Sequence, residues 1–596
     1  MHFLENIFNH LQASGERPVM QQVQEGRLLS SNGRQLLGLI YAARKFLLNA
    51  GLKKGDRCVL LAANDVRWAA VDLAAMAEGI IVVPLYSRQA PKDLARMIED
   101  CTPSLVVCGE AGLRDGVAQA SPQLPRTVLF EEIFAGETPH PSNPGWGGAP
   151  TEPSGADSEA RPAAPLADSD PVTIIYTSGT SGEPKGVVLT AGNLNHMLRC
   201  TGERLDLLMG QMSRPERVFH YLPFCFAGSW VLLLTCLSRN AVLTINTDLS
   251  RIKQDLEIAA PDYFLNVPTM LERMRAGICD QINKRGGVAG SIFHNATKAY
   301  LRRQGLKPSM DPILNGTTEV VPFHKTSARA AFGIREAFWL TLADWLAFPK
   351  IRANISPNLK ALICGSAPLA VETQLFFMML GIPVLQVYGL TETTAICTMD
   401  HPRAVVPGKV GPAIPGSEMK LGENQEILVR GPNVFSGYWK RPQETVKVLL
   451  DGWFHTGDQG EVDDAGNWRI IGRLKNLIIL NSGHNIAPEP LENELLRRLP
   501  GAQQLMLVGN GCSFLIAIIA GDCERAEVER VLEQFNRDLP HYKRIRAFHI
   551  SSEAFSVDNG LLTANGKLKR DAISSWFRSE IDEMYATSAV RSARPA

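Results

Sequence analysis

The sequence predicts an α/β protein with a large first domain and a smaller α+β domain at its C-terminal end. Three regions support this fold class. Between residues 30 and 135, helical patterns alternate with short apolar strands, which is typical of a parallel sheet. Short strands and Gly/Pro turns over 408–473 indicate a β-rich subdomain. Helices and strands then share residues 476–596, and a chain of 596 residues exceeds one hydrophobic core.

The first elements follow from the spacing of their apolar residues. Residues 1–12 are predicted to form a helix that docks on the body, because they lack the basic start and continuous apolar run of a signal peptide. The apolar face of this helix consists of Phe3, Leu4, Ile7, Phe8 and Leu11. Further helices are predicted over 36–52 and 70–78, and strands over 58–62, 80–85 and 105–108.

A change of composition interrupts this pattern. Residues 136–171 are rich in Pro, Gly, Ala, Ser and Asp, and Trp146 and Leu166 are almost the only large apolar side chains. Such a segment cannot bury enough apolar surface to offset the loss of chain entropy, so we predict a flexible, disordered loop. We interpret it as an insertion that the surface tolerates.

A second α/β block is predicted over 190–400, with a basic, mostly helical insertion at 274–356. Within the insertion, residues 332–348 form an amphipathic pattern with two interpretations. The apolar face packs on the protein body, which we favour, or it lies on a membrane surface and captures acyl chains, because both roles need the same apolar face. The residues concerned are Phe338, Trp339, Leu342, Trp345 and Leu346.

Composition limits the partners and the compartment. Lys plus Arg and Asp plus Glu number 61 each, so no long-range attraction to nucleic acid or to an anionic surface is expected. The eleven cysteines include no C-x-x-C pair, which argues against a disulfide framework or a zinc site and favours the cytoplasm. No apolar stretch approaches the roughly 20 residues that a spanning helix needs. We therefore expect a protein that does not cross a membrane.

The most informative motif is TSGTSGEPKG at 177–186. Apolar strands are predicted before it, at 172–176, and after it, at 187–189, so the motif closes a hairpin. Glycines let backbone N–H groups approach an anion, hydroxyls add donors, and Lys185 adds a charge. A surface turn with one lysine is the alternative. The mononucleotide P-loop is excluded, because Gly186 follows the lysine where that motif has Ser or Thr. The predicted phosphate-binding residues are Thr177, Ser178, Gly179, Thr180, Ser181, Gly182 and Lys185.

Five more motifs follow in a fixed order. They are GSAPL at 365–369, YGLTET at 388–393, GWFHTGD at 452–458, GRLKNLI at 472–478 and NGKLKR at 565–570. Together with the hairpin motif they resemble the adenylate-forming (acyl-activating) superfamily of acyl-CoA synthetases, peptide-synthetase adenylation domains and beetle luciferases. The insertion resembles the AMP-forming long-chain fatty acyl-CoA synthetases. The resemblance implies stacked α/β sheets within a domain of residues 1–473, followed by a small mobile domain of residues 474–596 that swings about Lys475.

The resemblance also implies roles for the charged residues. Glu392 and Thr177 are the expected Mg²⁺ contacts, since Mg²⁺ keeps most of its waters and needs few protein oxygens. Lys567 is expected to bridge the acyl carboxylate and the α-phosphate, with Lys569 as a competitor by charge alone. Without the motif, Glu392 would be interpreted as solvated surface.

The remaining motif residues are expected to bind the substrates. Asp458 has the geometry to accept hydrogen bonds from both ribose hydroxyls, although an Asx turn explains TGD equally well, and Arg473 is expected to reach the ribose or a phosphate. Gly365, Ser366 and Ala367 match the adenine side, where the ring of Tyr388 can stack on the purine. The same turn adds Gly389 and Thr391, and the loop 481–485 adds Gly483 and His484 for the thiol step with coenzyme A.

One departure from the family concerns the acyl pocket. Relatives have a histidine in an LP-x-x-H turn, whereas this chain has Phe226 there, and we interpret it as an aromatic flap of an apolar tunnel. The lack of that histidine, together with Ile479 in place of a lysine, disfavours luciferase-type oxidation.

The predicted function is a two-step ligation. A fatty acid, expected to be long-chain, reacts with Mg²⁺-ATP to give acyl-AMP and pyrophosphate, and coenzyme A then displaces AMP. An alternative acceptor is the phosphopantetheine of an acyl carrier protein. A lipid-binding protein without catalysis is disfavoured because Lys567, Glu392, Asp458 and Arg473 all match the motifs. We expect a cytoplasmic protein, with peripheral membrane contact as an option. The sequence determines neither the length of the acyl chain nor the acceptor.

Overall fold

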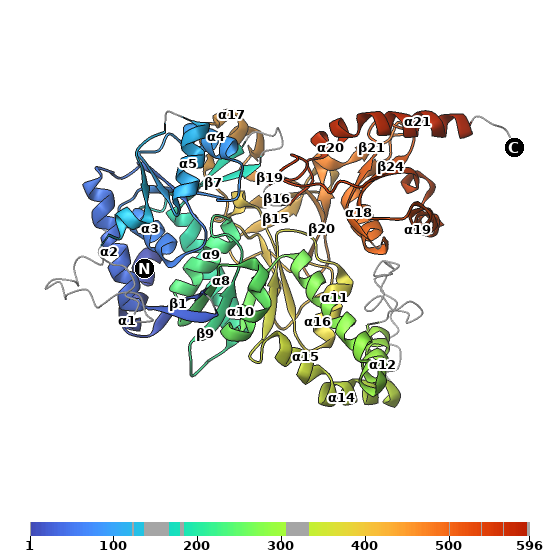
Figure 1. Ribbon diagram of the computed structural model, residues 1–596, viewed down its shortest axis with the longest axis horizontal. Coiled ribbons are helices and arrows are strands. Elements are labelled where there is room, and N and C mark those ends of the chain that lie inside the picture. The colour runs from blue at the N-terminus through green and yellow to red at the C-terminus, as the bar shows by residue number, and fades with distance from the viewer. Residues whose placement is uncertain are drawn as a thin grey trace.

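The computed structural model describes residues 2–24, 26–121, 124–135, 166–178, 184–304, 333–499, 501–537, 539–563 and 566–592. Most of the predicted loop 136–171 lies outside these residues, and its described end leads into a strand that begins at Pro171. A large domain is followed by a smaller C-terminal one, which lies at the upper right in Figure 1. The predicted α/β fold class, with domains of unequal size, is confirmed.

The first sheet of the large domain has eight strands in the order β14-β13-β12-β11-β9-β10-β1-β2. Its central strands β9 to β13 run parallel, while β2 and β14 are antiparallel at the two edges. Because parallel strands end at the same edge of a sheet, the loops after β9, β11, β12 and β13 lie together. The strands are β1 (Pro18–Gln24), β2 (Arg27–Asn32), β9 (Glu216–His220), β10 (Ala241–Asn246), β11 (Tyr263–Asn266), β12 (Ala361–Cys364), β13 (Val384–Tyr388) and β14 (Thr398–Met399).

The second sheet has seven strands in the order β17-β8-β7-β4-β3-β5-β6. Strands β3, β4 and β5 were predicted from their apolar runs, and every residue of β4 and β5 is buried, as expected for strands covered on both faces. The predicted hairpin is also confirmed, since β7 and β8 pair antiparallel. The strands are β3 (Arg57–Leu61), β4 (Ile81–Leu85), β5 (Leu105–Cys108), β6 (Thr127–Leu129), β7 (Pro171–Ser178), β8 (Pro184–Thr190) and β17 (Gly437–Tyr438).

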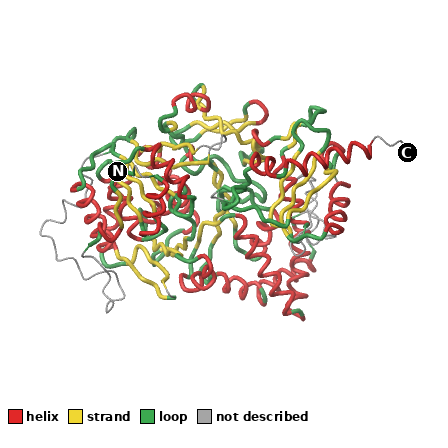
Figure 2. Tube along the Cα trace, turned by 45° about the horizontal axis from the view of Figure 1, so that its top comes forward, coloured by secondary structure: helices red, strands yellow, loops and turns green. Residues whose placement is uncertain are grey.

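Helices form layers between and outside these two sheets (Figures 1 and 2). The largest core joins both sheets through α1, α2, α3, α8 and α9, and α1 buries the five residues predicted for its docking face. A second core lies on the other face of the first sheet under α10, α11, α12, α15 and α16, and a smaller core lies under α4 and α5. The sheets are therefore stacked with helices between them, as the resemblance implied.

Local sequence explains where these helices begin and end. Asn32 and Gln35 form a reciprocal capping box at the start of α2, and Pro91 occupies the first turn of α4. The helices are α1 (Phe3–Ser14), α2 (Gly33–Asn49), α3 (Val66–Ala77), α4 (Pro91–Cys101), α5 (Ala111–Ala120), α6 (Phe130–Ile133), α8 (Ala191–Met209), α9 (Ala227–Leu237), η1 (Leu249–Arg251), α10 (Ile252–Ala259), α11 (Pro268–Arg285), α12 (Gly287–Arg303), α14 (Ile334–Leu346), α15 (Phe348–Ile355), α16 (Val371–Met379) and η2 (Thr391–Thr393).

The predicted β-rich subdomain corresponds to a five-stranded antiparallel sheet with the order β15-β16-β19-β18 and β20 paired to β19. Burial alternates along β19, so one face of this sheet packs on the body and the other faces solvent. Its elements are β15 (Glu418–Leu421), η3 (Glu423–Gln425), β16 (Glu426–Arg430), α17 (Pro442–Val448), β18 (Leu449–Leu450), β19 (Trp453–Val462) and β20 (Trp468–Arg473).

The C-terminal domain is built on a three-stranded sheet, β23-β24-β25, with an apolar core on each face. Helices α18 and α19 cover one face, and α20 and α21 cover the other. Its elements are η4 (Leu474–Asn476), β21 (Ile478–Ile479), β22 (Asn485–Ile486), α18 (Pro488–Arg498), β23 (Ala502–Val508), β24 (Leu515–Gly521), α19 (Arg525–Arg537), η5 (His541–Lys543), β25 (Ile545–Ser551), α20 (Arg570–Trp576) and α21 (Arg578–Ser592).

The described part of the insertion is helical, and one face of its amphipathic helix α14 packs on the body, which is the interpretation that we favoured from the sequence. Trp339 and Leu342 pack on the second core, whereas Phe338, Trp345 and Leu346 are exposed. Within the described residues, no helix combines the length and apolarity needed to span a bilayer. All eleven cysteines are free thiols.

One buried acid makes the stability of the fold depend on pH. The Nε1–H of Trp230 donates to Asp72 Oδ2 over 2.8 Å, while the second carboxylate oxygen is buried and has no hydrogen-bond partner among the described residues. Burial raises the pKa of Asp72 to about 7. Since the unfolded chain holds an ordinary aspartate, folding favours the protonated form, and stability falls as the pH rises from about 4 to about 7.

We therefore expect Asp72→Asn, which cannot ionise, to flatten this dependence. Relative to Asp72→Asn, the wild type should lose on the order of a few kcal/mol of stability between pH 5 and pH 8. Thermal melting of both proteins at the two pH values measures the difference. Asp451→Asn at an exposed position is the control and should melt with the wild-type pH profile; a parallel profile for Asp72→Asn would contradict the prediction.

Candidate active site

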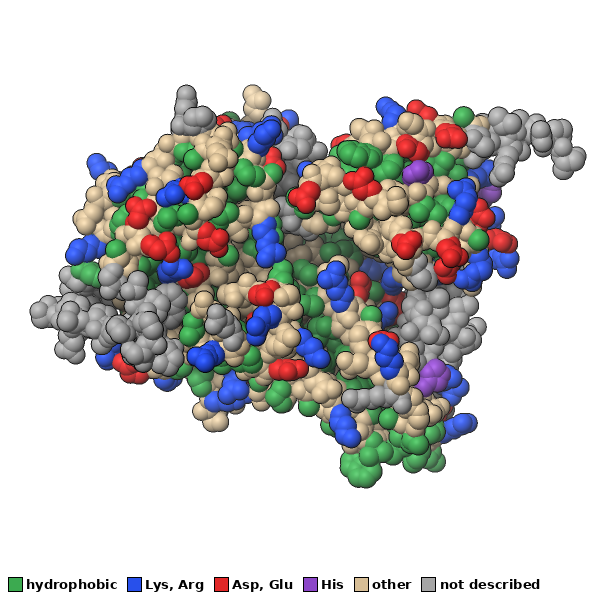
Figure 3. All heavy atoms as spheres, in the orientation of Figure 1, with side chains coloured by type: hydrophobic (Ala, Val, Ile, Leu, Met, Phe, Trp, Pro, Cys, Tyr) green, Lys and Arg blue, Asp and Glu red, His purple; other side chains and the backbone are tan. Residues whose placement is uncertain are grey.

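A cleft runs between the large domain and the C-terminal domain, visible as the hollow between the two bodies in Figure 3. The carboxyl ends of β9, β11, β12 and β13 from the first sheet open into it, as do those of β4 and β7 from the second. The third sheet adds Asp458 and Arg473, and the C-terminal domain adds Lys567. The fold thus brings together motifs that are almost four hundred residues apart in the chain.

The phosphate hairpin places two of its predicted residues in the cleft. Thr177 and Lys185 face each other across the antiparallel ladder of β7 and β8, and both line the cleft. The ammonium of Lys185 lies 2.7 Å from Glu444 Oε2 on α17. Ser178 ends β7. The predicted residues Gly179, Thr180, Ser181 and Gly182 lie outside the described residues.

Glu392 lies in η2, just after β13, and lines the cleft. The hydroxyl of Tyr438 donates to its Oε1 over 2.9 Å. Burial raises the pKa of Glu392, while that hydrogen bond and the charge of Arg473 oppose the rise. A nearby divalent cation would stabilise the carboxylate form, and Thr177 offers a second hard oxygen. The donor set therefore fits one Mg²⁺ that is held largely by water and phosphate oxygens.

Asp458 sits at the centre of the cleft with 4% of its surface exposed. Its Oδ1 lies 2.9 Å from Arg473 Nε in an ion pair, and its Oδ2 accepts a hydrogen bond from the hydroxyl of Tyr388 over 2.8 Å. The pairing follows from the fold, because Asp458 and Arg473 are opposite each other in β19 and β20. Burial raises the pKa of Asp458, and Arg473 and Tyr388 counteract the rise.

Two glycines beside this centre have neighbouring atoms so close that a side chain would collide with them. A Cβ at Gly365 would approach Val387 Cγ2 to 2.7 Å, and one at Gly389 would approach the Ala395 carbonyl oxygen to 2.2 Å. Packing alone therefore requires glycine at both positions. Ser366 has a positive φ of 72°, a strained conformation for a residue with a Cβ, and such strain concentrates at functional sites. Ala367 and Thr391 also line the cleft.

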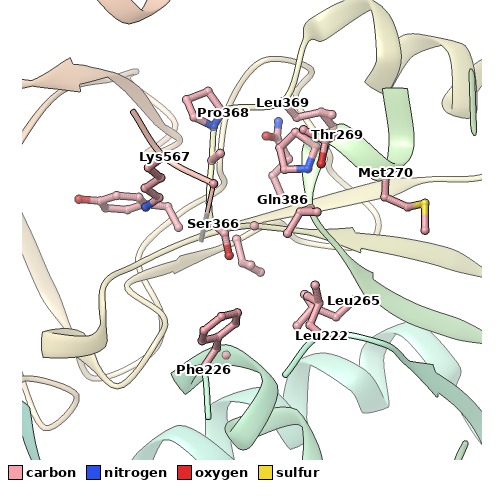
Figure 4. A pocket seen from close by; sticks show the side chains of 18 of the residues that line it. Leu222, Phe226, Leu265, Thr269, Met270, Ser366, Pro368, Leu369, Gln386 and Lys567 are labelled. Carbon is pink, nitrogen blue, oxygen red and sulfur yellow. The ribbon is translucent and has the colours of Figure 1, made fainter. Parts of the chain in front are cut away.

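Lys567 lines the cleft from the C-terminal domain, and in Figure 4 its side chain lies above and to the left of Ser366. The surrounding protein lowers its pKa, as does the charge of Arg473, while Asp458 favours the charged form. The residue is still exposed, so the cleft is open around it. No ion pair of Lys567 occurs among the residues that the structure describes. Its ammonium is therefore available to an anionic ligand.

Gly483 and His484 do not line this cleft. The ring of His484 stacks on Tyr542 at a centroid distance of 4.2 Å, and its Nδ1 lies 2.9 Å from the hydroxyl of Ser482. Gly483 has a φ of 82°, and the space around its Cα is open. In this arrangement of the domains, Lys567 lies in the cleft with residues of the other motifs, whereas Gly483 and His484 lie outside the cleft.

The comparisons agree with this geometry. Residues 12–439 match the AMP-binding enzyme family, and residues 475–589 match the AMP-binding enzyme C-terminal domain. The chain belongs to the AMP-binding enzyme family. The superfamily inferred from the six sequence motifs is thereby confirmed.

Named relatives of this AMP-binding enzyme cover nearly its whole length. The long-chain-fatty-acid–CoA ligase FadD15 of Mycobacterium bovis is 28% identical and covers 97% of this chain and 96% of its own. The human long-chain-fatty-acid–CoA ligase 6 is also 28% identical, covering 89% of this chain and 78% of its own. ATP-bound MatB from Rhodopseudomonas palustris shares the fold, with a TM-score of 0.67 at 21% identity over 97% and 99% of the two chains.

Sequence reasoning missed several residues of this AMP-binding enzyme's cleft. Tyr438 and Glu444 contact Glu392 and Lys185 from a strand and a helix that carry no recognised motif. Another omission links the domains, since Arg497 of α18 lies 2.6 Å from Glu372 of α16. No local pattern marks these residues, because each acquires its role from a partner distant in the sequence.

An apolar pocket adjoins the charged centre. In Figure 4, Phe226, Leu222 and Leu265 face the cavity from one side, opposite Ser366 and Lys567. Phe226 comes directly before α9, and its ring lies 5.4 Å from that of Tyr86. Thr269 and Met270 at the start of α11 extend the lining toward the insertion. The pocket can hold an apolar group whose polar end faces Lys567.

The contact between Lys185 and Glu444 generates a prediction about nucleotide affinity. Glu444 holds the lysine that the sequence assigns to phosphates, and Lys447 binds the same carboxylate. Glu444→Gln removes this competing charge, so we expect ATP to bind about two- to fivefold more tightly, the size of effect typical of a half-exposed ion pair. Isothermal calorimetry measures the affinity.

Glu418→Gln breaks a comparable ion pair with Arg430 outside the cleft and serves as the matched control. Its affinity for ATP should equal that of the wild type. Weaker ATP binding by Glu444→Gln would mean that Glu444 helps to hold the nucleotide instead of competing with it.

Proposed function

We propose that this AMP-binding enzyme joins a long-chain fatty acid to coenzyme A in an ATP- and Mg²⁺-dependent reaction that releases AMP and pyrophosphate. The observation that carries the proposal is the meeting of an apolar pocket with Lys567, Glu392 and the Asp458–Arg473 pair in one cleft. The names of FadD15 and of human ligase 6 support this substrate class and acceptor. The ATP-bound MatB of the same fold supports the nucleotide.

In the first step, an oxygen of the fatty-acid carboxylate attacks the α-phosphorus of ATP, and the bond to the β-phosphate oxygen breaks to release pyrophosphate. The two reactants are anions, so cations must offset their repulsion. Lys567 stands at the junction of the apolar pocket and the nucleotide side, where its charge stabilises both the carboxylate and the α-phosphate. We assign Lys185 to the phosphates, which it would contact after leaving the carboxylate of Glu444. Glu392 and Thr177 would hold a Mg²⁺ ion, which would neutralise phosphate charge when bound.

Other residues orient the nucleotide. Asp458 is held by Arg473 and Tyr388, so its carboxylate has a fixed direction before ATP binds. We assign to it the ribose hydroxyls, and to Gly365, Ser366, Ala367, Gly389 and Thr391 the adenine side of the site, with Tyr388 against the purine. The hairpin residues Ser178, Gly179, Thr180, Ser181 and Gly182 are assigned to the phosphates.

In the second step, the thiol sulfur of coenzyme A attacks the acyl carbonyl carbon, the bond to AMP breaks, and the thiol proton is released. Lys567 has then completed its role, and we propose that the C-terminal domain turns about Lys475. This motion replaces Lys567 with Gly483 and His484, which lie outside the cleft in the present arrangement. The open space around Gly483 allows a pantetheine arm to pass closely.

The proposal is tested by mass analysis of products from the purified protein with Mg²⁺-ATP and fatty acids of increasing length, with and without coenzyme A. We expect acyl-CoA only when coenzyme A is present. Lys567→Ala should lower acyl-AMP formation by at least about a hundredfold, in the range of losses for a group that stabilises developing charge. Lys569→Ala, the neighbouring exposed lysine, is the control and should keep most activity.

Two outcomes would contradict the proposal in different ways. If acyl-AMP accumulates unchanged in the presence of coenzyme A, coenzyme A is not the acceptor, and a carrier-protein phosphopantetheine takes its place in the proposal. Equal adenylation by Lys567→Ala and the wild type would refute the catalytic assignment of this lysine.

Phe226 generates a separate prediction about chain length. Its ring narrows the pocket beside Leu222 and Leu265, so Phe226→Ala should widen the entrance and shift the preferred acid by two or more carbons, changing kcat/KM ratios about tenfold. Competition between acids of different length measures the shift. Phe224→Leu, at a fully buried ring outside the cleft lining, is the control for altered packing. An unchanged chain-length profile in Phe226→Ala would contradict the role as a flap.

A further inference from the structure

Helix α14 carries an apolar stripe that no described residue covers. Ile334, Phe338 and Trp345 expose 92%, 56% and 76% of their surfaces. At about 100° per residue, the three positions fall within about 40° of one another around the helix axis. The opposite face, with Trp339, Leu340 and Ala343, packs on the second core. One face of α14 therefore packs on the protein body, and the exposed stripe lies on the opposite face of the helix.

The stripe lies at an extremity of the molecule. In Figure 3, hydrophobic side chains gather at the lower right, where Figure 1 places α14 beside α12. Large aromatic and branched side chains seldom cluster on a monomer surface unless they bind something. Trp and Phe on one face of a helix are typical of helices that lie in the boundary between lipid headgroups and acyl chains.

Charges around the stripe favour an anionic surface. Arg335 and Lys350 are exposed beside it, and neither has an acidic partner among the described residues. The neighbouring acids are neutralised, because Glu336 pairs with Arg302 at 3.0 Å and Asp344 pairs with Arg352 at 2.9 Å. The edge of α14 therefore carries a local positive charge although the whole chain is neutral.

The stripe also adjoins the far end of the cleft. Leu346, at the end of α14, and Lys350, on α15, are exposed and line the cleft as well, so the cleft opens to solvent at this junction. Ile278 and Ile282 of α11 and Phe293 of α12 continue the lining inward. An apolar molecule that lies against α14 has a continuous path toward the pocket at Phe226.

We propose that α14 is a membrane-docking element, which inserts Ile334, Phe338 and Trp345 into the surface of an anionic lipid bilayer and sets the α14–α15 opening of the cleft against it. Three such side chains offer about 450–750 Å² even when fully exposed. A stable protein dimer buries about 800 Å² on each partner. Binding to a lipid surface does not need a minimum buried area of this kind, because single aromatic side chains can insert into it. The docking itself does not require the ligase activity; only the delivery of acid to the cleft rests on the proposed function.

Co-sedimentation with vesicles tests the docking without any substrate. The full chain is mixed with vesicles of phosphatidylcholine with and without phosphatidylglycerol. We expect the wild type to bind the anionic vesicles, and the double variant Phe338→Ser, Trp345→Ser to bind at least about tenfold more weakly. Both substituted side chains are exposed, so the variant should melt at the wild-type temperature.

Trp576→Ser is the matched control, because Trp576 is 55% exposed on α20 of the C-terminal domain. It should bind vesicles as the wild type does. The proposal is overturned if the wild type does not bind the anionic vesicles, or if the double variant binds them equally well. It is also overturned if the stripe variant changes the sedimentation coefficient of the free protein, since the stripe would then be a contact between copies of this chain.

A second measurement separates the surface from the catalytic site. Lipids brominated near the headgroup should quench tryptophan fluorescence in the wild type and Trp576→Ser, and Trp345→Phe should lose most of that quenching. If the proposed ligation is correct, the double variant should turn over vesicle-borne long-chain acid about fivefold more slowly while its rate on a water-soluble medium-chain acid stays unchanged. Failure of the ligase assay with normal vesicle binding would count against the proposed function alone.

Discussion

The carboxylate of Asp458 connects three parts of this AMP-binding enzyme. It lies on β19 of the third sheet, accepts a hydrogen bond from Tyr388 at the end of the first sheet, and pairs with Arg473, where the large domain ends. It also attracts Lys567 of the C-terminal domain. A buried carboxylate without partners would be costly, so these groups must stay close. The position of this one acid therefore links the ends of the first and third sheets to Lys567 of the C-terminal domain.

Several cations of the cleft are already engaged. Arg473 is bound to Asp458, Lys185 to Glu444, and Arg497 to Glu372 across the domain boundary. These ion pairs hold the three cationic side chains in fixed positions. The carboxylates of the pairs also compete with any anionic ligand for the same cations. Lys567 differs, since its ammonium has no ion-pair partner among the described residues and its pKa is lowered. A cation that lacks a direct ion pair with the described residues and adjoins an apolar pocket is suited to a carboxylate with an apolar tail.

The apolar half of the site is continuous with the surface. Phe226 and Leu265 enclose the pocket near the charged centre, and Phe293 and Leu346 continue the lining into the helical insertion. Helix α14 thus has apolar residues on two faces: Trp339 is partly buried and packs against the core, and Trp345 is exposed. Because α14 has apolar residues on two faces, one face packs on the protein body while the other presents an apolar stripe to solvent.

The sequence by itself determined the fold class, the elements with clear periodicity and the family, because apolar spacing and contiguous motifs are local properties. The docking face of α1, the strands β3 to β5 and the β7–β8 hairpin all follow from such spacing. Only the tertiary structure decided that Glu444 holds Lys185, that Tyr438 contacts Glu392 and that α14 exposes Trp345 while it packs Trp339 against the second core. These relations join residues distant in the chain, or depend on which face of a helix meets the core. A one-dimensional pattern carries neither kind of information.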